Sequence, residues 1–125
     1  MSNATQFFEN IKKAVLTNIN TAMPAMILSY NETTCTAKIQ PLFKVKEVGK
    51  EPVSLPAIEG VPVLKQKFRV NGGAVQTYTP VYSEGEVVYV VFSQRALDEA
   101  QKGNNVFPGT SRMFSIHDAV IVGLF

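Results

Sequence analysis

The sequence predicts a mainly β protein, a small Greek-key barrel of five or six strands preceded by an N-terminal amphipathic helix. Three observations predict this fold. From residue 24 onward, short runs of β-branched and aromatic residues alternate with turns that contain Gly, Pro and Asn. The run Val87–Phe92 is entirely apolar and follows a turn glycine, which is typical of a central strand buried on both faces. Helical spacing of apolar residues is confined to the N-terminal region.

The helix is expected over Thr5–Ala22. Apolar residues form one stripe along it, namely Phe7, Phe8, Ile11, Val15, Leu16, Ile19, Ala22 and Met23. Asn3 and Gln6 are suited to cap its start. Pro24 is expected to end it, because the residue before a proline is disfavoured in helical geometry.

An apolar stripe at a chain end is expected to pack against another element, and two alternatives remain. The stripe packs on its own domain, or it packs on neighbouring copies in an oligomer. For the second case the predicted subunit interface consists of Phe7, Phe8, Ile11 and Val15.

The first strands are expected over Ala25–Tyr30 and Thr34–Val48, with a turn at Asn31–Glu32 between them. Pro41 interrupts the alternation in the second run, which indicates a bulge or bend at a barrel corner. The run Val53–Leu64 contains two prolines and is therefore expected to be an edge or irregular strand.

The second half of the chain continues this pattern. Asn71–Gly73 is a strong turn signal, and the alternating run Val75–Pro80 follows it. After Val87–Phe92, residues Arg95–Lys102 favour a helix, and Met113–Phe125 is expected to form the last strand. Strands at this spacing, with Gly and Pro at the corners, favour an OB-type barrel, and a small β-sandwich is the alternative.

The length of 125 residues predicts one structural domain, with the helix in residues 1–23 and the barrel in residues 24–125. The net charge of +2 does not identify a partner, but the charges are unevenly distributed. Residues 38–69 carry seven basic and three acidic side chains, whereas residues 84–99 carry one basic and four acidic side chains. Such a division suits stacked contacts between copies, or it reflects lysines that protect strand edges. No apolar stretch is long enough to span a membrane.

The sequence offers little for catalysis. His117 is the single histidine, and on a strand its neighbour Asp118 would point to the opposite face, so the two are not expected to form a relay. Cys35 is the single cysteine and is interpreted as a small strand residue. One Cys and one His at distant positions do not make a zinc site. We therefore expect no catalytic residue, no metal site and no cofactor; a hydrolase accessory domain that uses His117 is a minor alternative.

Nucleic-acid binding is the main alternative function, because OB-type barrels with a basic groove and aromatic faces bind single strands. The candidate residues are Phe43, Lys44, Lys46, Lys67 and Phe68. The chain is only mildly basic and has no tryptophan, so this alternative is disfavoured.

Five segments, in this order, resemble the N-terminal OB-fold domain of the central spike (membrane-puncturing needle) proteins of contractile-tailed bacteriophages. They are residues 19–31, 36–42, 55–63, 84–98 and 114–123. The likeness covers nearly the whole chain.

The resemblance implies a structural role in the virion tail after synthesis in the cytoplasm of a host bacterium. Spikes of this family are trimers. Their N-terminal barrels form a collar on the baseplate hub, and their C-terminal β-helix pierces the membrane. We therefore expect a homotrimer whose partners are other tail or baseplate proteins. No β-helix repeats occur before Phe125, so the piercing tip and its metal site are not carried over. Asp118 is expected to satisfy a turn or to pair with Arg112.

Overall fold

The computed structural model describes residues 2–46, 49–105, 107 and 112–125. The chain divides into two compact units. The helix–loop unit consists of Met1–Thr21 and Phe92–Asp118, and the barrel unit consists of Ala22–Val91 and Ala119–Phe125. The predicted division at residues 23 and 24 remains a prediction.

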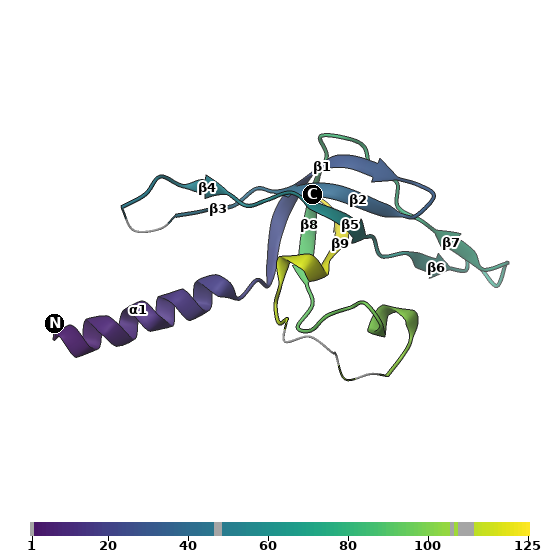
Figure 1. Ribbon diagram of the computed structural model, residues 1–125. Coiled ribbons are helices and arrows are strands. Elements are labelled where there is room, and N and C mark those ends of the chain that lie inside the picture. Colours follow the sequence, from purple (N-terminus) through teal and green to yellow (C-terminus); the bar gives the residue numbers. More distant parts are fainter. Residues whose placement is uncertain (1, 47–48, 106, 108–111) are drawn as a thin grey trace. The chain divides into compact units, whose positions relative to one another are not determined.

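The barrel unit is built on a five-stranded sheet with the order β5-β2-β1-β8-β9 (Figure 1). Its strands are β1 (Ala22–Asn31), β2 (Thr36–Pro41), β5 (Ile58–Pro62), β8 (Val87–Phe92) and β9 (Ala119–Leu124). β1 pairs antiparallel with β2 and β8, and β2 pairs antiparallel with β5. The two edges of the sheet also meet: a parallel bridge joins Val63 to Ile121, and the Leu64 amide donates to the Ile121 carbonyl at 3.3 Å. This half-barrel confirms the predicted fold, a small OB-type barrel with one N-terminal helix.

The core of the barrel unit follows the two-residue period of its strands. Along β1 and β8, buried residues alternate with more exposed ones. The largest side chains removed from solvent are Ile27, Ile39, Val61, Val88, Val90 and Ile121. A bulge between Ile27 and Ser29 shifts the β1–β2 register and bends the sheet, as barrel closure requires.

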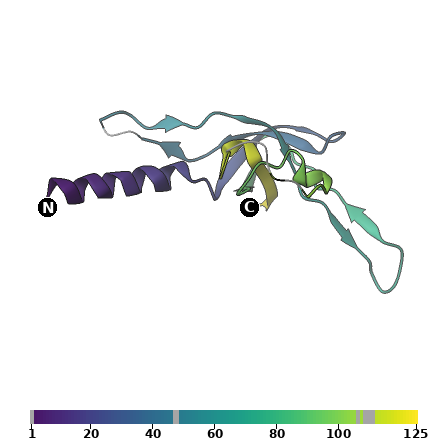
Figure 2. The ribbon, with the colours of Figure 1, turned by 60° about the horizontal axis from the view of Figure 1, so that its bottom comes forward.

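Two short hairpins extend from the sheet at opposite ends of β5 (Figures 1 and 2). One pairs β3 (Lys44–Val45) with β4 (Val53–Ser54), and the other pairs β6 (Gln66–Phe68) with β7 (Gln76–Tyr78). The strand predicted over Thr34–Val48 is interrupted after Pro41, because β2 ends at Pro41 and β3 starts at Lys44; a bulge or bend at Pro41 remains a prediction.

The helix–loop unit contains α1 (Asn3–Asn18), which differs from the predicted helix at both ends. Ser2 is the N-cap, since its Oγ accepts from the Thr5 amide at 3.1 Å. The helix ends four residues before the predicted end, and Pro24 lies inside β1. The residues after Leu16 are all β-branched or Asn up to residue 21, and such residues have low helix propensity. The prediction that Pro24 ends the helix was therefore wrong.

Three further local predictions were wrong. Residues 95–102 form only one 3₁₀ turn, Ala100–Lys102, and a second 3₁₀ turn, Ile116–Asp118, delays the last strand to Ala119. Cys35 is not in a strand but in the β1–β2 turn, with φ of 54°. The Asn31 side chain holds this turn by accepting hydrogen bonds from two backbone amides.

Candidate assembly surfaces

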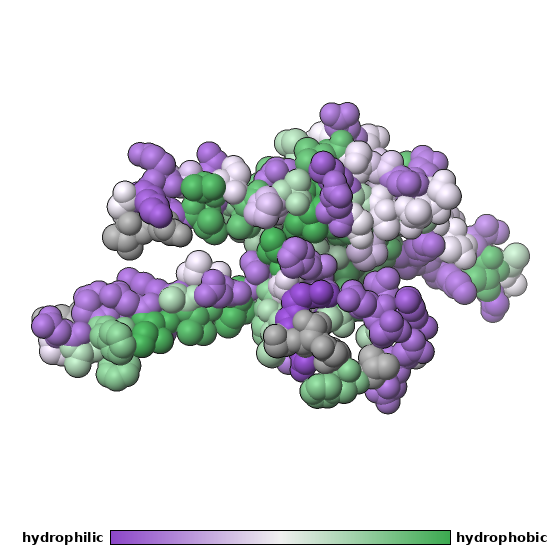
Figure 3. Space-filling model, in the orientation of Figure 1, coloured by the Kyte–Doolittle hydropathy of each residue, from purple (hydrophilic) through white to green (hydrophobic). Residues whose placement is uncertain are grey.

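The predicted interface residues Phe7, Phe8, Ile11 and Val15 all lie on α1 and are 45–67% exposed. Leu16 is exposed too, and none of the described α1 residues is buried. Figure 3 shows these apolar side chains along one side of the helix and polar ones along the other. We call this surface the α1 stripe (Phe7, Phe8, Ile11, Val15 and Leu16). A helix with one apolar face normally buries it against another element.

A second apolar surface lies on β8. It was not predicted from the sequence, because all apolar residues of this strand were expected in the core. The sequence predicted a strand buried on both faces. In the structure Val88 and Val90 are fully buried, whereas Tyr89 and Val91 are 39% and 38% exposed. The unbroken apolar run was the signal for this surface, because a strand with one solvated face normally alternates with polar residues.

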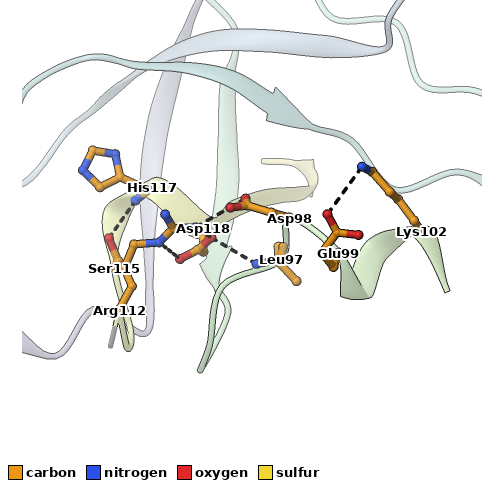
Figure 4. A network of polar contacts seen from close by, with 8 residues as sticks. All are labelled: Leu97, Asp98, Glu99, Lys102, Arg112, Ser115, His117 and Asp118. Atoms are coloured by element: carbon orange, nitrogen blue, oxygen red, sulfur yellow. Dashed lines mark hydrogen bonds and ion pairs between the residues drawn. The ribbon is translucent and has the colours of Figure 1, made fainter. Parts of the chain in front are cut away.

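The helix–loop unit is held by a polar cluster around the buried carboxylate of Asp118 (Figure 4). Arg112 donates to it twice, from Nε to Oδ2 at 2.8 Å and from Nη2 to Oδ1 at 2.7 Å. The Leu97 amide donates to Oδ1 at 3.2 Å. The predicted pairing of Asp118 with Arg112 is thereby confirmed. A two-point contact of this kind fixes geometry as well as charge.

Opposing effects set the pKa of Asp118. Burial alone raises the pKa of this carboxyl, but the hydrogen bonds from Arg112 and from the Leu97 amide, together with the charge of Arg112, lower it further than burial raises it. The pKa of Asp118 therefore lies below its ordinary value, and the same hydrogen bond raises the pKa of Arg112. The carboxylate stays ionised and acts as a structural acceptor.

The other residues considered for chemistry belong to different units. His117 is exposed in the 3₁₀ turn Ile116–Asp118, not on a strand as expected, and its backbone amide donates to Ser115 Oγ at 3.1 Å. Cys35 is in the barrel unit and its thiol contacts the Glu32 carbonyl. In the part of the chain that the structure describes, no three His, Cys, Asp or Glu side chains gather where a metal ion could bind.

The candidate nucleic-acid residues fall on two different hairpins. Lys44 is in β3, with Phe43 and Lys46 next to it, whereas Lys67 and Phe68 are in β6. Since β4 leads into β5 and β6 follows it, the two groups lie at opposite ends of β5 (Figure 1). The structure does not bring them together in one groove.

Exposed apolar surfaces on an OB-type barrel are typical of proteins that assemble with partners. The family model of the phage protein Gp138 N-terminal domain matches residues 23–123, and the chain belongs to this family. Membership indicates a structural role in a bacteriophage, together with other virion proteins. No curated protein matches the chain in a sequence comparison. None of the described helices is long and apolar enough to cross a membrane.

Proposed function

We propose that the chain is a structural component of a contractile phage tail, a collar or adaptor where the central spike meets the baseplate hub. It acts as a homotrimer through protein–protein contacts, and not as an enzyme. Family membership and the five segments that resemble spike domains support this assignment. The observation that carries it is the α1 stripe, because large apolar side chains gathered on one exposed surface are typical of an interaction site.

Measuring the molar mass of the purified chain tests this proposal. Light scattering at high micromolar concentration should give three times the mass of the chain. Ile11→Glu should lower this mass, because it puts a charge in the α1 stripe, while Lys13→Glu on the opposite side of the same helix should leave it unchanged. A strict monomer at that concentration would contradict the proposal.

A polarisation titration with labelled single-stranded oligonucleotides tests the alternative function. The two basic and aromatic groups lie on separate hairpins, so we expect no appreciable binding at low salt. Strong binding that weakens steeply as salt is added would favour the nucleic-acid function instead, because phosphate contacts release counterions.

A further inference from the structure

The outside of three neighbouring strands is apolar. Side chains of β1, β8 and β9 alternate between the core and the outside. The outward positions are Ala22, Pro24, Met26, Leu28, Val87, Tyr89, Val91, Val120, Val122 and Leu124. Pairing places Pro24 opposite Tyr89 and Met26 opposite Val87. These ten residues therefore form one continuous surface, called here the apolar outer face.

The rest of the sheet has the opposite character. The outward residues of β2 are Thr36, Lys38 and Gln40, and Lys38 forms an ion pair with Glu59 of β5 at 3.4 Å. In the strand order β5-β2-β1-β8-β9, a polar half thus adjoins an apolar half. A sheet face in contact with water carries polar residues at its outward positions. The division between β2 and β1 indicates that the apolar half is covered in the assembled protein.

We propose that the apolar outer face is the docking site for α1 of a second copy of this chain. The inference rests on the proposed homotrimer and names the two surfaces that meet in it. Each copy has one apolar helix stripe and one apolar sheet face. The α1 stripe is complementary to the apolar outer face, because a helix packs on a sheet by burying its apolar stripe against an apolar face of the sheet.

The two surfaces are comparable in size. The α1 stripe runs from Phe7 to Leu16, about 14 Å along a helix that is about 10 Å wide. The apolar outer face extends about 20 Å along β1 from Ala22 to Leu28, and about 10 Å across three strands. One helix laid along β1 and β8 covers most of this face and at the same time buries the α1 stripe.

The proposed homotrimer supplies a second copy of α1 next to every apolar outer face, and we therefore assign the docked helix to a second copy. The chain's own helix is the competing occupant, and the cross-linking below separates the two.

A contact between two different surfaces of identical chains is head-to-tail, and such contacts form a ring when the rotation closes. In a closed ring every α1 stripe and every apolar outer face has a partner. A ring of three satisfies this condition with the predicted stoichiometry.

Cross-linking between two differently sized forms of the full chain tests the docking. In a Cys35→Ser background, one form carries Val15→Cys in the α1 stripe, and the other, with a size tag, carries Val122→Cys in the apolar outer face. A short bismaleimide should join tagged to untagged chains at least fivefold more than in two control pairs. One control replaces Val15→Cys by Lys13→Cys on the side of α1 opposite the stripe, and the other replaces Val122→Cys by Lys38→Cys on the polar half of the sheet.

Mass measurements on charge variants give a second, independent readout. Val122→Glu should weaken self-association at least tenfold, as Ile11→Glu does, while Lys38→Glu should not. Circular dichroism verifies that each variant folds, and the cross-linking remains decisive for any variant that does not. If the chain still forms trimers but the test pair and the two control pairs give equal cross-linking yields, the docking inference is overturned and the proposed function stands. A chain with both cysteines that cross-links only within itself would also overturn it. A monomeric wild type would instead refute the homotrimer.

Discussion

Replacing Asp118 by asparagine tests whether the Arg112–Asp118 pair stabilises the helix–loop unit. The two carboxylate oxygens accept three hydrogen bonds, two from Arg112 and one from the Leu97 amide. Asparagine keeps the shape of the side chain, but it offers a single acceptor oxygen and no charge.

The expected cost follows from these contacts. Hydrogen bonds to charged groups contribute about 1.5–3 kcal/mol each, and part of this gain is offset by the desolvation of the buried carboxylate. Losing at least one charged hydrogen bond and weakening the others should lower the free energy of unfolding by about 2–4 kcal/mol. A domain is stable by about 5–15 kcal/mol, so this is a large fraction.

Urea titrations followed by circular dichroism at pH 7 measure this change. Asp98→Asn is the matched control, since Asp98 touches the same Arg112 at 3.4 Å but its side chain is 76% exposed; an exposed pair of this kind contributes little. A wild-type midpoint for Asp118→Asn, or equal effects of the two substitutions, would refute the structural role of the cluster.

Lowering the pH should erase the difference between the wild type and Asp118→Asn. The folded-state pKa of Asp118 is depressed, so its contribution is complete above the unfolded pKa of about 3.9 and is lost as the pH falls through the folded value; urea midpoints between pH 6 and 2 measure this. Ile27→Ala empties a fully buried position and should cost about 2–5 kcal/mol by the same titration. Tyr30→Phe removes the hydroxyl that donates to the Pro80 carbonyl at 2.6 Å and should cost about 0.5–1.5 kcal/mol.

The strands of the barrel could be predicted because their signals are local. Alternation in β1 and β2, the apolar run of β8 and the end of β2 at Pro41 each follow from a few adjacent residues. The element ends could not be predicted in the same way. Met113–Asp118 looks like part of a strand, but its conformation depends on bonds to distant residues, namely from the Phe114 amide to the Gln94 carbonyl and from the Leu97 amide to the Asp118 carboxylate.

The surfaces were only partly predictable. Helical spacing was enough to find the α1 stripe, because a single helix shows its apolar side in its own sequence. The apolar outer face was hidden, since a run such as Val87–Phe92 has the same composition whether its outward side chains meet the same chain or another one. Separating the two requires the strand order, which joins residues 22–28 to residues 119–124.

The hydrogen bonds at the base of the segment between β8 and β9 have a consequence for how this domain tolerates change. The Ser93 amide donates to the Asp118 carbonyl at 2.9 Å, and a bridge joins Arg95 to Met113. Because hydrogen bonds hold both ends of this segment together, doubling its length raises the entropic cost of closing the loop by only about 0.6 kcal/mol. An insertion between these ends should therefore leave the barrel intact, and a short epitope placed after the exposed Asn104 should leave the fold unchanged.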